Sequence, residues 1–415
     1  MRWTIAAARA PGIILLAVLA HGLWSGGGRM NSVTGRPFLH DQIPFHAAGV
    51  ACRSGCRELY DQASQRALQA ASFGPGERAD HRPFVAPPHT ALLYAVPSLL
   101  PFPVFAAAAA ALNLAMLGLA LRLLGAGPGA VLAAFGFYPV FDGFGVGQNV
   151  FLTLFLFAAA LRLWQAQRGF AAGLVAGLVA AYKPHLLVGV GLLWLIEARR
   201  DVRPLAGLLC AAFAFVLFDV AFLWQEARVW AGWAMGALSI EKPLWSGMTP
   251  AGEFTVVELY ALLLPGSGRL ASALTAATLL LGGAAAVRLW RRDSASRPLA
   301  YAAAMVLTLW LVPHAHRYEW TLLLLPGLVL WHELPAWRPR LAAVYAGLYL
   351  VAALAIRVAR WQLDSFGIAL HPALPALALG AAVCALAIER ARREQPAREG
   401  ADERLLTDAG PNGGG

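Results

Sequence analysis

Long apolar runs separated by short polar segments form the basic pattern of this chain. Each run, when helical, approaches or reaches the length that crosses the ~30 Å hydrocarbon core of a bilayer. The pattern predicts membrane-spanning helices near residues 11–25, 103–124, 128–144, 149–165, 169–183, 185–198, 204–224, 269–289, 298–312, 318–333, 341–357 and 370–389. We therefore expect an all-α polytopic membrane protein.

One further apolar segment is interrupted by prolines. Residues 86–101, APPHTALLYAVPSLLP, contain four of them. This segment is either an additional span or an interfacial or re-entrant helix. The expected total is eleven to thirteen spans, and residues 1–390 form one transmembrane domain. The first run follows two arginines like a signal peptide, but with so many spans behind it we expect an uncleaved helix.

The composition supports a membrane protein. Of the 415 residues, 59% are hydrophobic and 13% are charged, whereas soluble domains carry about 25% charged residues. The C-terminal segment 391–415 is charged and then glycine-rich. We expect it to be a disordered cytoplasmic tail.

The net charge of +10 indicates an orientation rather than a nucleic-acid partner. The arginines gather in short loops and in the C-terminal tail, as the positive-inside rule describes for a bacterial plasma (inner) membrane protein. The extracytoplasmic regions are then residues 26–101, 145–149, 225–268 and 313–319. This topology requires that residues 86–101 do not cross the membrane. Cys52 and Cys56 lie in the first region, where a disulfide is permitted but not shown by the spacing.

The first extracytoplasmic loop carries candidate catalytic groups. A carboxylate at the edge of the hydrocarbon, as expected for Asp41, can act as a general base, because desolvation raises its pKa while a nearby cation keeps it ionised. His46 and Tyr60 follow in the same loop as candidate sugar or acceptor ligands. The alternative is that Asp41 caps the helix beginning near Ile43. Further candidates on this face are Arg82, Glu226, Arg228, Glu241 and Lys242, and we expect most of them to be ordinary solvated loop charges.

The segment GVGQNV at 145–150 places a small-residue turn and two amides at the end of a span. Gln148 and Asn149 can donate and accept hydrogen bonds with sugar hydroxyls. The alternative is a helix start stabilised by the Asn149 side chain.

A lysine stands inside an apolar stretch. Lys183, in AAYKPHLL, is one of only two lysines in the chain. A charged residue at mid-membrane costs roughly 3 kcal/mol even on lenient insertion scales unless it faces a wet cavity or a partner. Two short spans meet at this lysine, so we expect it near the outer face, either as a snorkelling anchor or as a phosphate ligand.

The segment LVPHAHRYEW at 311–320 concentrates His314, His316 and Arg317 between apolar runs. These side chains suit a phosphate or a sugar. The two histidines can also hold a metal, but no third ligand lies nearby in sequence, so we expect no metal site and treat a divalent cation as optional. Nucleotide-binding motifs are missing. A transferase built from these residues would take its donor from the lipid phase.

Several short motifs follow one another in a characteristic order. They are DQIPFHAA from Asp41, Leu59–Tyr60, FVAPP from Phe84, GQN from Gly147, Ala172–Gly173, Lys183–Pro184 and PHAH from Pro313. Together they resemble glycosyltransferase family 87, membrane enzymes similar to the polyprenol-phosphate-mannose-dependent α-mannosyltransferases. The resemblance covers roughly residues 10–335.

This resemblance implies a GT-C-type fold with its catalytic aspartate at Asp41 and a polyprenyl-phosphate sugar donor. The sugar, by this resemblance mannose, would pass to a glycolipid or glycan acceptor in one inverting displacement. Lys183, His314, His316 and Arg317 would bind the donor phosphate, and Gln148, Asn149, Tyr60 and His46 would bind the sugar or the acceptor. The partners would be this donor, this acceptor and membrane lipids.

A transporter or flippase for a lipid-linked or polar solute is the competing interpretation, since transporters also contain broken helices and cavity-facing charges. Against it, the sequence has no repeated halves, and its polar groups gather on one face.

Overall fold

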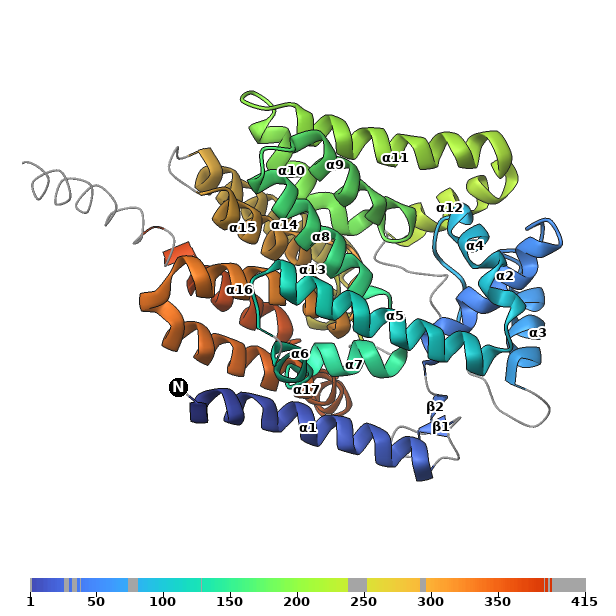
Figure 1. The fold of residues 1–415 in the computed structure, drawn as a ribbon, viewed down its shortest axis with the longest axis horizontal. Coiled ribbons are helices and arrows are strands. Elements are labelled where there is room, and N and C mark those ends of the chain that lie inside the picture. The colour runs from blue at the N-terminus through green and yellow to red at the C-terminus, as the bar shows by residue number, and fades with distance from the viewer. Residues whose placement is uncertain are drawn as a thin grey trace, which may run out of the picture.

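The computed structural model describes residues 2–25, 30–31, 36–37, 39–73, 81–127, 129–237, 252–291 and 296–383, with residues 385, 386 and 389. Within that part the only strands are β1 (Met30–Asn31) and β2 (Arg36–Pro37), which pair antiparallel. All other regular structure there is helical (Figure 1). The predicted all-α polytopic fold is confirmed.

Most predicted apolar runs form one helix each. These are α1 (Arg2–Ser25), α5 (Phe102–Leu123), α8 (Val150–Gln165), α11 (Arg203–Phe222), α14 (Gly268–Arg291), α15 (Arg297–Leu311), α17 (Arg338–Phe366) and Ala373–Val383. By length and composition, four helices in the described part can cross a membrane, and six shorter apolar helices accompany them. The figure of eleven to thirteen spans therefore stays a prediction.

The remaining four runs are each broken into two helical pieces. The pieces are α6 (Ala130–Phe135) and α7 (Tyr138–Val146), α9 (Gly169–Gly177) and the 3-10 helix Leu178–Ala181, the 3-10 helix Pro184–Leu187 and α10 (Val188–Glu197), and the 3-10 helix Arg317–Leu323 and α16 (Leu324–Glu333). Of the predicted site residues, Lys183 lies between the second and third of these runs, and Arg317 begins the fourth.

Four helices, called the extramembrane helices below because they are not among the apolar helices that could cross a membrane, gather at one end of the molecule. Figure 1 shows α2 (Ile43–Arg53), α3 (Gln62–Phe73), α4 (Pro88–Ala95) and α12 (Trp224–Ala237) together, at the end where α1 finishes. A disulfide joins Cys52 to Cys56 just after α2. The helix α13 (Val256–Leu263) packs on α14.

The proline-broken segment forms α4 and the 3-10 helix Pro97–Leu99. The eight residues of α4 rise only about 12 Å at 1.5 Å per residue, well short of the ~30 Å hydrocarbon core. Leu93, Val96 and Leu99 are more than 60% exposed, which suits contact with lipid at the membrane surface. The segment therefore lacks the length to cross as one helix, as the predicted topology requires.

Proline in the first turn begins many of the helices, because its fixed φ suits that position and its missing N–H is not needed there. The prolines are Pro44, Pro88, Pro103, Pro139, Pro204, Pro298 and Pro339. At the other end of α7, Gly147 has φ +85°, a left-handed conformation that glycine adopts readily. This turn ends α7 and places Gln148 immediately before α8.

Small residues let α9 and α11 approach closely. A Cβ added to Gly173 would lie 1.9 Å from the Pro204 carbonyl oxygen, and one added to Gly207 would lie 2.1 Å from that of Phe170. Such contacts are typical of helix pairs in membranes, where close van der Waals packing replaces the hydrophobic drive. The position of α9 matters because it leads into the segment carrying Lys183.

The main hydrophobic core joins α5, α8, α10, α15, α16 and α17. Trp194, Tyr301 and Trp320 are among its fully buried side chains. Trp320 lies next to Glu319, so the polar site described below rests directly on the rigid centre of the bundle.

Candidate active site

Asp41 lies in the 3-10 helix His40–Gln42, just before α2, and is only 7% exposed. Its Oδ1 lies 2.8 Å from Arg82 Nη1 and 3.5 Å from His40 Nε2, and its Oδ2 accepts a 2.6 Å hydrogen bond from Gln148 Nε2. Burial alone would raise the pKa of Asp41, but Arg82, His40 and the Gln148 amide together hold it below the ordinary value. The carboxylate is therefore ionised at neutral pH.

Two alternatives from the sequence are wrong. The N-cap residue of α2 is Gln42, which makes no side-chain cap bond, and the Asp41 carboxylate is bound elsewhere. Arg82 is not an ordinary solvated charge, because its guanidinium pairs with Asp41. The Arg82 backbone is itself fixed, since its N–H donates to Gln69 Oε1 and its carbonyl accepts from Gln69 Nε2.

Gln148 connects Asp41 to Lys183. While its Nε2 donates to Asp41, its Oε1 accepts a 3.3 Å hydrogen bond from Lys183 Nζ. The backbone carbonyl of Gln148 accepts from Asn113 Nδ2 at 3.0 Å, and the Gln42 side chain donates to the carbonyl of Gly147. The turn at the end of α7 is thus fixed from both sides, which orients the Gln148 amide.

Lys183 lies between the 3-10 helices Leu178–Ala181 and Pro184–Leu187, and its side chain is 12% exposed. Its Nζ forms a 2.7 Å ion pair with Glu319 Oε1 and lies 5.3 Å from the centre of the Tyr318 ring. The snorkelling interpretation is wrong, because the ammonium is engaged by an internal carboxylate and an amide rather than directed to an interface. Glu319 also accepts from the His316 N–H through Oε2 at 2.8 Å, so it ties Lys183 to the histidine turn.

The two histidines of that turn are held by the segment preceding α13. His314 Nδ1 lies 3.0 Å from Glu253 Oε1, and His316 Nδ1 lies 3.1 Å from the Gly252 carbonyl oxygen. Burial and the neighbouring His314 lower the pKa of His316 below its ordinary value. Because a carbonyl only accepts, His316 carries its hydrogen on Nδ1, and Nε2 of the neutral ring is an acceptor.

Arg317 is paired within the fold. Its Nε and Nη2 contact Asp142 Oδ2 and Oδ1 at 2.8 and 2.5 Å, and its guanidinium stacks 5.0 Å from the centre of the Tyr138 ring. This bidentate pair connects α7 to the 3-10 helix Arg317–Leu323. Asp142 therefore neutralises the Arg317 charge within the fold, whereas the sequence analysis assigned Arg317 to the donor phosphate.

The structure does not bring His46 and Tyr60 to Asp41. His46 contacts the Leu100 carbonyl oxygen through Nε2 at 3.0 Å and Ser72 Oγ through Nδ1 at 3.3 Å. The Tyr60 hydroxyl donates to the Ala86 carbonyl oxygen at 2.7 Å. Both side chains hold the extramembrane helices together.

Asn149 occupies the N-cap position of α8 without a side-chain cap bond, and its Oδ1 is buried without a partner in the described part of the chain. The interpretation of Asn149 as a side-chain cap is therefore wrong. Since Asn149 directly follows Gln148, an unused acceptor here is consistent with a polar ligand.

Sequence reasoning assigned no role to three carboxylates of this region: Asp142, Glu253 and Glu319. Each pairs with a residue that the sequence singled out, respectively Arg317, His314 and Lys183. The only available signal was general, namely that a charge inside an apolar run needs a partner. Within the described residues, no group of three His, Cys, Asp or Glu side chains could hold a metal ion.

Comparison with known families decides the class of protein. The model of glycosyltransferase family 87 (GT87) matches residues 84–313, more than half of the chain. The chain belongs to glycosyltransferase family 87. It is therefore a membrane glycosyltransferase, and the all-helical, polytopic structure agrees with a GT-C-type fold. A search of curated proteins and a search of solved structures each gave no match.

The family 87 match covers only part of the candidate site. Gln148, Asn149 and Lys183 lie inside the matched residues. The match begins at Phe84, two residues after Arg82. Asp41 and His314 to Arg317 lie outside them. The connection of Asp41 to the matched region is spatial, through Gln148 Nε2.

Proposed function

We propose that this family 87 protein transfers mannose from a polyprenyl-phosphate donor to a glycolipid or glycan acceptor on the extracytoplasmic face of a bacterial plasma membrane. The observation that carries the proposal is the bonded series Asp41–Gln148–Lys183, which puts a buried carboxylate and a partly buried ammonium on either side of one amide. A sugar phosphate reacting with a hydroxyl needs this pair of opposite charges. Membership of a glycosyltransferase family favours this function over transport.

In the proposed mechanism, Asp41 accepts the proton of the acceptor hydroxyl as its oxygen attacks the anomeric carbon. The bond from that carbon to the phosphate oxygen breaks on the opposite face, so one displacement inverts the configuration. Arg82 and Gln148 keep Asp41 ionised and oriented before the acceptor binds. The leaving polyprenyl phosphate takes the electron pair.

Lys183 is the group best placed to stabilise that leaving phosphate. A preorganised donor aimed at developing charge is worth about 3–4 kcal/mol in well-studied enzymes. Its partner Glu319 compensates the ammonium in the free enzyme, and a phosphate dianion would replace part of that interaction. His314 and His316 lie on the turn that Glu319 holds. His316, neutral in the free enzyme, would donate to phosphate through Nε2 only after taking up a proton.

The test is sugar transfer by Asp41→Asn in membranes supplied with labelled polyprenyl-phosphate mannose. Asparagine keeps the size of the side chain but cannot accept the proton at neutral pH, so we expect transfer to fall by about 10²–10⁴-fold, the usual contribution of a general base. Asp61→Asn is the matched control, because Asp61 is an exposed carboxylate of the same extramembrane region.

Transfer by Asp41→Asn at the wild-type rate, with equal expression, would show that Asp41 is not the base. If the wild-type protein transfers glucose or galactose from the corresponding polyprenyl phosphates but not mannose, the choice of sugar is wrong and the mechanism stands.

A further inference from the structure

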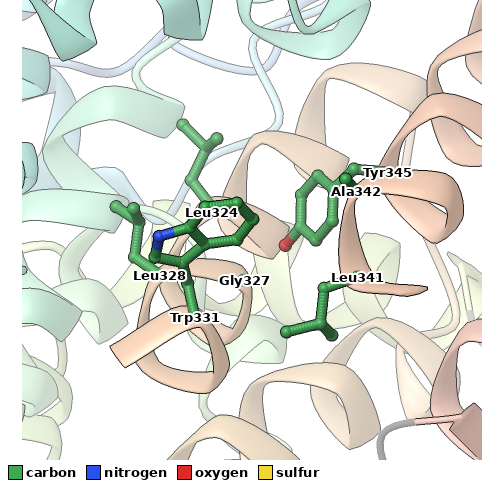
Figure 2. Close-up of a pocket in the computed structure, with 7 residues that line it drawn as sticks. All are labelled: Leu324, Gly327, Leu328, Trp331, Leu341, Ala342 and Tyr345. Atoms are coloured by element: carbon green, nitrogen blue, oxygen red, sulfur yellow. The ribbon is translucent and has the colours of Figure 1, made fainter. Parts of the chain in front are cut away.

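The helices α16 and α17 form the walls of a partly open apolar cavity, which none of the candidate active-site residues lines. Its volume is about 180 Å³, and Figure 2 shows Trp331 facing Leu341 and Tyr345 across it. The complete lining is Leu324, Gly327, Leu328, Trp331, Leu341, Ala342 and Tyr345. This volume is below the roughly 300–1,000 Å³ of a site for a whole drug-sized ligand. It is close to the ~150 Å³ of apolar cavities that hold a benzene-sized hydrocarbon.

The depth of the cavity in the membrane follows from its position on α17. Residues 335–366 form a candidate membrane span, so residues 341–345 lie about two to three turns inside its beginning. Trp331 and Trp337 both precede the first residue of α17, and tryptophan is enriched at the membrane interface. The cavity therefore lies just below the level of lipid headgroups, where the upper part of an acyl chain is found.

The mouth of the cavity is basic. The Arg338 guanidinium stacks 5.4 Å from the centre of the Trp331 ring, and its Nε donates to the Trp331 carbonyl oxygen at 3.0 Å. Arg340 stacks 4.9 Å from the centre of the Trp337 ring. Among the described residues, neither guanidinium has a carboxylate partner, although other arginines in this chain do, such as Arg317 with Asp142. Each retains donors for an external anion.

Further basic groups lie at the same end of the bundle. A Cβ built on Gly125, just after α5, would lie 3.4 Å from His332 Nε2 and 3.8 Å from Arg162 Nη2. The ends of α5, α8 and α16 therefore meet next to the start of α17. Such a surface attracts anionic lipid by about 1 kcal/mol for each basic residue near it.

The phosphate recognised here is not the reacting one. The 3-10 helix that carries Glu319 leads directly into α16, and Arg338 follows at the far end of α16. The ten residues of α16 alone rise about 15 Å. A donor with its phosphate at Lys183 would not reach the arginines with that same group.

We propose that an anionic glycerophospholipid binds between α16 and α17, with one acyl chain in the cavity and its phosphate at Arg338 and Arg340. An apolar cavity at acyl-chain depth, with unpaired guanidinium groups one turn above it, matches the two parts of such a lipid. A zwitterionic lipid offers the same chains but a headgroup with its own cation, so it gains less from the arginines. This proposal does not depend on the proposed mannosyl transfer.

The test is lipid retention by the purified full-length protein, reconstituted in nanodiscs with equal amounts of phosphatidylglycerol and phosphatidylethanolamine and then released for native mass spectrometry. Wild type should retain phosphatidylglycerol preferentially. Arg338→Gln and Arg340→Gln should each lower that retention about fivefold, the factor for 1 kcal/mol per basic residue.

The acyl-chain part of the site is tested by Ala342→Trp, which fills the cavity from an exposed position of α17. The matched control is Ala343→Trp, the next residue, which is exposed but does not line the cavity. Only the first should reduce bound phosphatidylglycerol. Equal retention of the two lipids, loss in both tryptophan variants, or retention of polyprenyl phosphate instead would each overturn the proposal. Size-exclusion profiles identify any variant that fails to fold.

Discussion

Among the groups that keep Asp41 ionised, Arg82 has the largest effect. Their oxygen and nitrogen atoms lie 2.8 Å apart, and Arg82 is the principal group that lowers the Asp41 pKa against the effect of burial. Arg82→Met should therefore raise that pKa. Because the base must be deprotonated, the acidic limb of the kcat/KM profile should move to higher pH by about one unit or more, as an arginine lowers a nearby carboxyl by about 1–3 units.

The backbone at residue 82 should keep its place in Arg82→Met, because Gln69 holds its N–H and carbonyl. Arg57→Met is the control, since it removes an exposed arginine from the same region. An acidic limb that stays in place in Arg82→Met, or moves to lower pH, would contradict the assignment of Asp41 as the titrating base.

Lys183 and Glu319 should have opposite effects on donor binding. Lys183→Met removes a cation from the phosphate and should lower kcat/KM for the donor by roughly 10- to 150-fold. This corresponds to about 1.5–3 kcal/mol, the range for a hydrogen bond to a charged group. Glu319→Gln removes the competing carboxylate but keeps an oxygen that can accept from the His316 N–H. It should lower the donor KM. Steady-state kinetics with varied donor concentration measures both effects.

Measurements of thermal stability distinguish a catalytic role of Lys183 and Glu319 from a purely structural one. Each single variant leaves a buried charge without its partner, at a cost of about 3–5 kcal/mol, whereas the double variant Lys183→Met/Glu319→Gln removes both charges. The double variant should recover thermal stability but not turnover. Recovery of both would mean that the pair is only structural.

At the scale of helices, the positions of proline and glycine indicate where many of the helices begin, end or break. The run 128–144 was predicted as one span, yet it breaks at Phe137, two residues before Pro139. A proline inside a helix cannot bond the carbonyl four residues earlier and clashes with it, and α6 ends at that position, Phe135. This break was therefore available to sequence reasoning. The junction at Lys183–Pro184 was anticipated for the same reason.

The polar contacts between distant helices could not be predicted from the sequence in that way. Asp41 and Gln148 are 107 residues apart, Lys183 and Glu319 are 136 apart, and Arg317 and Asp142 are 175 apart. No local spacing or periodicity links such positions. The order of the family 87 motifs identified Asp41, Gln148 and Lys183 individually, but only the packing of the helices shows which carboxylate meets which cation.

The close contact between α9 and α11 gives a prediction at this scale. Gly173→Ala would bring a methyl group 1.9 Å from the Pro204 carbonyl oxygen, so the helices must separate. Overpacking usually costs about 1–3 kcal/mol. We expect a lower Tm in detergent and reduced transfer, because α9 leads to Lys183. Gly191→Ala in α10 is the control, since its added methyl meets nothing within 4 Å. Equal Tm values for the two variants would show that this contact is not limiting.

At the scale of the whole molecule, the proposed chemistry requires the extramembrane helices to lie outside the cytoplasm. Figure 1 places α2, α3, α4 and α12 at one end of the bundle, and α4 is too short to cross. Asp41 precedes α2 and belongs to the same end. By contrast, the turn after α8 lies between Arg162 and Arg168, where the positive-inside rule predicts the cytoplasm.

Cysteine labelling in whole cells tests this arrangement. In a background with Cys210 and Cys384 replaced by alanine, the remaining Cys52 and Cys56 are paired as a disulfide and do not react. A cysteine at exposed Asp61 should then react with a membrane-impermeant maleimide in intact cells, once the reagent passes any outer membrane. A cysteine at exposed Ala166 should react only after the plasma membrane is permeabilised. The reverse pattern would place Asp41 in the cytoplasm and would rule out the extracytoplasmic transfer proposed for this enzyme, whatever the kinetics of the Asp41 variants.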